Sequence, residues 1–205
     1  MSELFNVNNG FFRTIGKIVD CIYVSILWLV CCIPVVTIGA STTALYYTVH
    51  KSIVEDNGYI FRDFKHSFCS NFKQSTIAWL ILLVVGGVLG GDTFLTYQFK
   101  KTGDKAGNVF YLILLLLVIL FITVTYIFPY ISRFEDNMKT VFKNAIFMGF
   151  GNILLTLLMI ITFAVAVYLV YVAPPLIVIV PALYMLGIEQ LMERAFKKYI
   201  PQQEA

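Results

Sequence analysis

The chain has 205 residues, of which 59% are hydrophobic and only 13% charged, and its mean hydropathy is +0.82. An average soluble domain is about 45–50% apolar and about 25% charged, and 15 basic plus 12 acidic side chains are too few to cover a soluble surface of this size. The net charge of +3 gives no indication of a nucleic-acid partner. The composition therefore predicts one integral membrane domain, 1–205, in contact with the lipid bilayer.

Four apolar segments follow one another along the chain, at 18–49, 75–99, 109–131 and 152–188. A helix needs about 20 residues to cross a bilayer, so the second and third segments each predict one crossing. The first and last segments are too long for one crossing and must break.

Prolines mark where the two long segments break. The first contains Pro34 followed by Gly39, and the last contains the pair Pro174 and Pro175. Proline removes a helical hydrogen bond and disfavours helix in the residue before it. The pattern predicts an all-α transmembrane bundle of about six spans: 18–34, 38–56, 75–99, 109–131, 150–172 and 175–193.

The second span is the least apolar of the six because it is rich in hydroxyl side chains: Ser41, Thr42, Thr43, Tyr46, Tyr47 and Thr48. A re-entrant or interfacial helix is the alternative there, which leaves five crossings. Lysine and arginine concentrate on the cytoplasmic side of membranes. Six crossings place 12 basic residues inside and 3 outside, whereas five crossings give 10 and 5 at best. The charge pattern therefore favours six crossings with both termini cytoplasmic.

Two cytoplasmic stretches resemble each other. One contains Phe72-Lys73-Gln74 and the other Phe142-Lys143-Asn144, and an apolar run begins soon after each. This similarity indicates three helical hairpins, 18–56, 75–131 and 150–193, preceded or joined by amphipathic cytoplasmic helices.

Four phenylalanines share one face of the first of these amphipathic helices: Phe61, Phe64, Phe68 and Phe72. Aromatic residues at this spacing are typical of a helix lying in the membrane interface. The same spacing occurs in helices that dock into a groove of a partner protein. The sequence leaves both interpretations open.

Glycines recur at four-residue spacing in the third span, as Gly86 with Gly90 and Gly87 with Gly91. Small residues at this spacing let two membrane helices approach closely. We expect packing within the chain, and self-association is the alternative.

Motifs for chemistry are absent from the sequence. The ionisable residues of the apolar segments, such as Asp20, His50, Asp92, Glu189 and Glu193, lie near the predicted interfaces, which counts against an ion-coupled transporter. No nucleotide-binding, zinc-protease or hydrolase motif occurs. The two histidines have no evident metal-ligand partners in sequence, and the four cysteines form no C-x-x-C pair. We therefore expect no catalytic, cofactor-binding or metal-binding residues, and no enzyme.

The segment from Trp28 to Tyr47, with Phe61-Arg-Asp-Phe64 and Asn71-Phe-Lys-Gln74, resembles the YesL-like family of small bacterial membrane proteins. The matching motif positions are Pro34, Thr37, Gly39, Phe64, Asn71, Phe72 and Lys73. The family supplies no catalytic residues. Physically, Pro34 and Gly39 suit a tight turn, and the Thr37 hydroxyl can bond backbone groups that the proline frees.

The resemblance implies a bacterial plasma-membrane protein associated with carbohydrate ABC importers. We expect a non-enzymatic accessory or regulatory subunit that contacts permease subunits. A stand-alone small-solute transporter or channel, lined by the hydroxyls of the second span with Asn152 and Thr156, is the alternative.

Overall fold

The computed structural model describes residues 10–101 and 109–198, and these two ranges form helices without any strand. The seven α-helices are α1 (Gly10–Cys32), α2 (Ile38–Thr48), α3 (Ile60–Lys101), α4 (Val109–Arg133), α5 (Met138–Gly151), α6 (Ile153–Val172) and α7 (Val180–Lys197). Short 3-10 helices precede α2 and α7, at η2 (Val35–Thr37) and η5 (Pro174–Val178), and a π-helix, η3 (Val49–Val54), continues α2. The predicted all-α class is confirmed.

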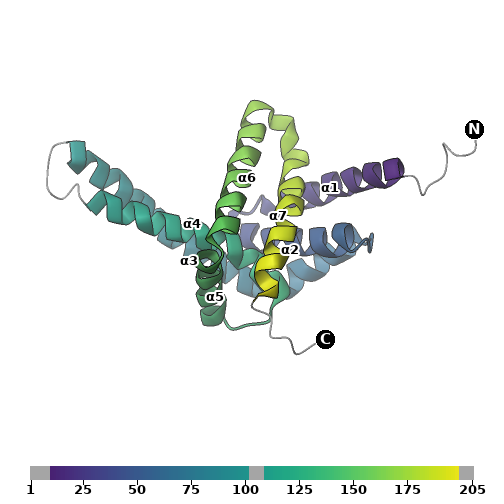
Figure 1. Ribbon diagram of the computed structural model, residues 1–205, viewed down its shortest axis with the longest axis horizontal. Helices are drawn as coiled ribbons and strands as arrows, with labels where there is room; N and C mark the ends of the chain where they lie inside the picture. Colours follow the sequence, from purple (N-terminus) through teal and green to yellow (C-terminus); the bar gives the residue numbers. More distant parts are fainter. Residues whose placement is uncertain (1–9, 102–108, 199–205) are drawn as a thin grey trace, which may run out of the picture.

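The helices meet at a common centre and extend from it in three directions (Figure 1). α3 and α4 run side by side as one long arm, and α6 stands beside α7 as a second, upright pair. α1 and α2 form a third pair on the opposite side from the α3–α4 arm, while α5 lies beneath the centre. Helices end next to Pro34 and next to Pro174, where the sequence predicted breaks.

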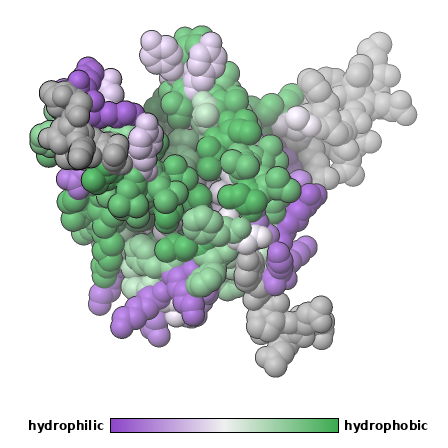
Figure 2. Space-filling model, turned by 60° about the vertical axis from the view of Figure 1, so that its left-hand side comes forward, coloured by the Kyte–Doolittle hydropathy of each residue, from purple (hydrophilic) through white to green (hydrophobic). Residues whose placement is uncertain are grey.

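Four helices are long and apolar enough to cross a membrane: α1 over Thr14–Cys32, α3, α4 and α6. Figure 2 shows a broad hydrophobic surface with hydrophilic residues at its lower edge and at its upper left. Because apolar side chains are exposed over this broad surface and four helices are long enough to cross a bilayer, the protein is embedded in a membrane. α2 has only 11 residues, and α7 carries four charged residues. Six crossings remain a prediction.

α3 differs from the expected arrangement. It is one uninterrupted helix of 42 residues, roughly 63 Å long at the usual rise. The predicted amphipathic helix and the predicted span 75–99 are its two consecutive parts. No proline or glycine lies between Ile60 and Val85, so nothing bends the chain where a helix in the membrane plane would have to turn.

Helix α2 forms the centre of the packing. It is buried along most of its length and runs antiparallel to the first half of α3, because Ser52 bonds Asp63 and Thr43 bonds Ser75. At its start, a Cβ on Gly39 would lie 2.5 Å from the Ser75 carbonyl oxygen. Only glycine permits this approach of α2 to α3.

Thr37 closes the turn between α1 and α2. Its hydroxyl lies 2.6 Å from the Cys31 carbonyl oxygen and 2.7 Å from that of Pro34, and donates to these groups. Thr37 thus bonds the backbone carbonyl of the proline and that of a residue before it. Trp79 of α3 holds the same turn by donating its indole N–H to the Val35 carbonyl, at 2.7 Å.

Candidate functional site: a cleft and a charged cluster at the polar end

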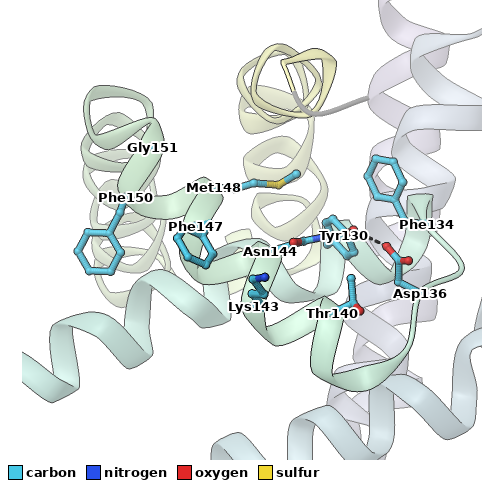
Figure 3. A pocket seen from close by; sticks show the side chains of 10 residues that line it. All are labelled: Tyr130, Phe134, Asp136, Thr140, Lys143, Asn144, Phe147, Met148, Phe150 and Gly151. Atoms are coloured by element: carbon cyan, nitrogen blue, oxygen red, sulfur yellow. Dashed lines mark hydrogen bonds between the residues drawn. The ribbon is translucent and has the colours of Figure 1, made fainter. Parts of the chain in front are cut away.

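An open cleft of about 900 Å³ lies between the end of α4 and α5. Figure 3 shows its lining: Tyr130, Phe134, Asp136, Thr140, Lys143, Asn144, Phe147, Met148, Phe150 and Gly151. One end is polar, around Tyr130 and Asp136, and the other is formed by the rings of Phe147 and Phe150. The cleft thus offers hydrogen-bonding groups and apolar surface side by side.

Two amides fix the connection between α4 and α5. Asn144 donates to the Tyr130 hydroxyl at 2.7 Å, and that hydroxyl donates to the Asp136 carboxylate. Gln74 of α3 donates to the Asp136 backbone carbonyl, also at 2.7 Å. Gln74 and Asn144 are the amides that follow the two Phe-Lys pairs in sequence. The two similar stretches therefore both contact the α4–α5 loop, Gln74 directly and Asn144 through the Tyr130 hydroxyl.

Exposed aromatic rings continue from this cleft. Phe147 and Phe150 are 60% and 50% exposed, and the Lys143 ammonium lies 5.8 Å from the centre of the Phe147 ring. Large apolar rings that border a polar groove on a protein surface are typical of interaction sites.

The predicted phenylalanine face of α3 divides into two parts. Phe61 and Phe72 are exposed, but Phe64 is buried and Phe68 packs against the core. Phe64 and Phe68 stack on each other with ring centroids 6.2 Å apart. A docking role remains open to Phe61 and Phe72, whereas Phe64 already has its partners within the chain.

A cluster of charged side chains lies near the same end, where η3 meets the ends of α4 and α7. His50 Nδ1 is 2.8 Å from Glu189 Oε1 and 3.8 Å from Glu193 Oε1. Arg133 binds both oxygens of Glu193, through Nε and Nη2 at 3.1 Å each. The Tyr46 hydroxyl donates to Glu193 at 3.2 Å. The Glu189 side chain is only 5% exposed.

The other ring nitrogen of His50 points to a further carboxylate. His50 Nε2 is buried and lies 3.2 Å from Glu55 Oε1. The two groups are not aligned for a hydrogen bond. Lys51 binds the second oxygen of Glu55 at 2.8 Å. This hydrogen bond from Lys51 holds the pKa of Glu55 below its usual value, so Glu55 stays ionised at neutral pH.

The sequence did not reveal this cluster. His50 was expected to lack metal-ligand partners, but in the structure it lies beside Glu189 and Glu193. These glutamates are 139 and 143 positions further along the chain, so no local pattern showed the proximity. The three residues His50, Glu189 and Glu193 have the donor types and the spacing of a metal-binding group. The only local signal was that both glutamates fall one helical turn apart, on one face of α7.

Several hydroxyls of the predicted solute path are engaged in hydrogen bonds within the chain, whereas Thr42 lines a cavity between helices and the buried Ser41 Oγ has no hydrogen-bond partner among the described residues. Thr43 bonds Ser75 and its own helix, and Thr48 bonds the Ala44 carbonyl. Thr156 of α6 bonds the Tyr126 hydroxyl and the Gly149 carbonyl. These side chains join helices to one another, so they give a solute channel little support.

The remaining predicted positions lie in different surroundings. Asn71 donates to Ser67 within α3, and Lys73 is exposed. Among the glycines, a Cβ on Gly86 would meet Leu120 of α4 at 3.3 Å, whereas Gly87, Gly90 and Gly91 face open space. Packing within the chain thus involves Gly86, and self-association through the other three stays a prediction.

A family model described as "Protein of unknown function, DUF624" matches residues 21–93 of this chain. The matched part covers the second half of α1, all of α2 and η3 and most of α3, and contains all seven motif positions named above. No curated protein and no solved structure gave a significant match.

Proposed function

We propose that this chain is a non-enzymatic membrane subunit that docks a cytoplasmic segment of a partner membrane protein in the cleft between α4 and α5. The partner is a permease subunit of a carbohydrate ABC importer, and the chain assists or regulates that importer. The observation that carries the docking role is the open 900 Å³ cleft with the exposed rings of Phe147 and Phe150 beside it.

The form of the cleft supports a protein segment as its occupant. Phe147 and Phe150 provide an apolar anchor site, and Lys143 and Thr140 stand between them and the polar end. Aromatic anchors surrounded by polar groups contribute most of the binding energy in typical interfaces. Gln74 and Asn144 fix the floor of the cleft before binding, which lowers the ordering cost of association.

The choice of partner rests on the resemblance to the YesL-like family. Two of the hydroxyls that a solute path would need, those of Thr43 and Thr156, are engaged in hydrogen bonds between helices, which favours the accessory role.

Affinity purification from native membranes in mild detergent tests this proposal. The tagged full chain is expected to recover ABC permease subunits, identified by mass spectrometry. Phe147→Ala removes an exposed anchor and should reduce the recovery at least about tenfold, as truncation of a central aromatic contact commonly does.

Phe94→Ala is the matched control, since Phe94 is 65% exposed on the other half of α3. Recovery of permease subunits with Phe94→Ala but not with Phe147→Ala supports the proposal. Repeated recovery of the wild-type chain alone, in detergents that keep known importers intact, would refute it.

A further inference from the structure

We infer that His50, Glu189 and Glu193 bind one divalent transition-metal ion of the Zn²⁺ type, which ties η3 to α7. This inference is independent of the docking function proposed above.

The donor atoms have the right chemistry and nearly the right spacing. Imidazole nitrogen and carboxylate oxygen are common Zn²⁺ ligands at about 2.0–2.2 Å, so tetrahedral ligand atoms lie roughly 3.4 Å from one another. His50 Nδ1 is 2.8 Å from Glu189 and 3.8 Å from Glu193, and all three ligand atoms lie within 4.8 Å of one another. Small side-chain rotations would bring these distances to the tetrahedral value, and Glu193 Oε1 would exchange its contacts with Arg133 and Tyr46 for the metal ion.

Glu189 is the carboxylate of this cluster whose described contacts include no lysine or arginine, although Arg194 and Lys197 line the same cavity. Glu193 is neutralised by Arg133, and Glu55 by Lys51. Glu189 is almost completely buried, and its one described partner is His50 Nδ1. A neutral imidazole with its lone pair toward Glu189 would place two acceptors 2.8 Å apart. In that tautomer a cation must lie between them, because an isolated buried carboxylate is costly. In the other tautomer Nδ1–H donates directly to Glu189, so metal titration distinguishes the two.

The orientation of His50 favours a metal ion in that position. The ring is stacked on Tyr46, with centroids 6.5 Å apart and nearly parallel planes. Its buried Nε2 faces Glu55 at 3.2 Å. Metal-binding histidines usually give their second N–H to a carboxylate, which orients the ring and fixes the tautomer. Glu55 lies near enough for this role, and a small rotation of the ring or the carboxylate would align the hydrogen bond. With the hydrogen on Nε2, Nδ1 would carry the lone pair that binds the metal.

The backbone of η3 contributes to the arrangement. η3 is a π-helix, in which the Glu55 N–H bonds the His50 carbonyl at 3.1 Å. π-helical turns are rare and occur often at functional sites. A cavity of about 420 Å³ opens beside the cluster, so a water molecule can complete the coordination as fourth ligand.

Metal titration of the untagged full chain in detergent tests this inference. After treatment with a chelator, the wild-type protein is expected to bind one Zn²⁺ per chain by calorimetry. Co²⁺ should bind with the visible absorption of a tetrahedral site. Glu189→Gln keeps the shape of the side chain but removes its charge, and should weaken Zn²⁺ binding at least about tenfold.

Two further variants keep the test decisive. Glu55→Gln lies outside the ligand set and should weaken binding about 10–100-fold, as loss of an orienting carboxylate does. Glu135→Gln changes an exposed acid in the α4–α5 loop and should bind Zn²⁺ like wild type. Wild-type protein that elutes as a single folded species and binds no Zn²⁺ would overturn the inference. Wild-type-like affinity in folded Glu189→Gln would overturn it as well.

Discussion

At the scale of single residues, glycine positions that look alike in sequence have unlike roles. Gly39 lies where α2 meets α3, and a Cβ there would also approach Trp79 Cβ at 2.7 Å. Gly87 lies on an open face of α3 with nothing within 4 Å. Glycine to alanine at Gly39 therefore tests close packing, and the same substitution at Gly87 measures the effect of helix propensity alone.

Gly39→Ala is expected to destabilise the protein by about 2–3 kcal/mol, because backbone atoms must move to admit the methyl group. For a chain of this size, that corresponds to a fall of several degrees in the melting temperature. The measurement is thermal unfolding in detergent, followed by intrinsic fluorescence.

Gly87→Ala is the matched control and should melt at or slightly above the wild-type temperature, since alanine favours helix by up to about 1 kcal/mol. A Gly39→Ala variant as stable as Gly87→Ala would show that α2 and α3 do not approach as closely as described.

At the scale of the elements, the amide contacts explain how separate helices form one cleft. Gln74 connects α3 to the α4–α5 loop, and Asn144 connects α5 to α4. Each amide donates one hydrogen bond to an oxygen that belongs to another element. These two bonds therefore add to the packing of α4 against α5 in holding the cleft in shape.

Gln74→Glu should loosen the loop, because it replaces a donor 2.7 Å from the Asp136 carbonyl with a negatively charged acceptor. The expected loss of stability is about 1–3 kcal/mol, as for other unsatisfied buried groups. Limited proteolysis between α4 and α5 should become faster, and thermal unfolding should begin earlier.

Gln98→Glu serves as control for Gln74→Glu, since Gln98 is an exposed residue of the same helix. It should leave both the proteolysis rate and the melting temperature unchanged. Equal proteolysis of the two variants would show that Gln74 does not hold the loop.

Local features of the fold could be predicted from the sequence, and long-range ones could not. Pro34 and Pro174 act on neighbouring residues, so the helix ends beside them were predictable. The continuity of α3 agrees with the absence of proline and glycine from its first 26 residues, but the packing of α2 along it joins distant segments, which no local pattern reveals. The pairing of His50 with Glu189 joins residues 139 positions apart, and without an alignment nothing in the sequence connects them.

At the scale of the whole molecule, the depth of the turn between α1 and α2 decides how the chain lies in the bilayer. Val35 in this turn is bonded to Trp79, which lies 22 residues before Lys101, or roughly 33 Å along α3. That distance already equals the thickness of the hydrocarbon core. The turn therefore lies near the inner end of the apolar part of α3, far from its outer end. α1 also runs across the direction of α6 (Figure 1).

We therefore predict that α1 and α2 together form a re-entrant or interfacial hairpin, which goes beyond the alternative of a re-entrant second span alone and leaves four crossings. Both ends of such a hairpin lie on the same side, so 12 basic residues stay inside and 3 outside, as with six crossings. The charge distribution cannot distinguish these two arrangements, but the accessibility of the turn can.

Cysteine labelling in intact cells measures this accessibility. Ile33 is 78% exposed in the turn, so Ile33→Cys, in a chain whose four native cysteines are replaced by alanine, reports where the turn lies. A membrane-impermeant maleimide added outside should label Lys101→Cys and leave Ile33→Cys unmodified. In a second chain that keeps only native Cys69, which is exposed on the first half of α3, labelling should occur only after the membrane is made permeable. Labelling of Ile33→Cys as fast as Lys101→Cys would instead establish that α1 and α2 cross the bilayer, because only a full crossing brings the turn to the outer surface.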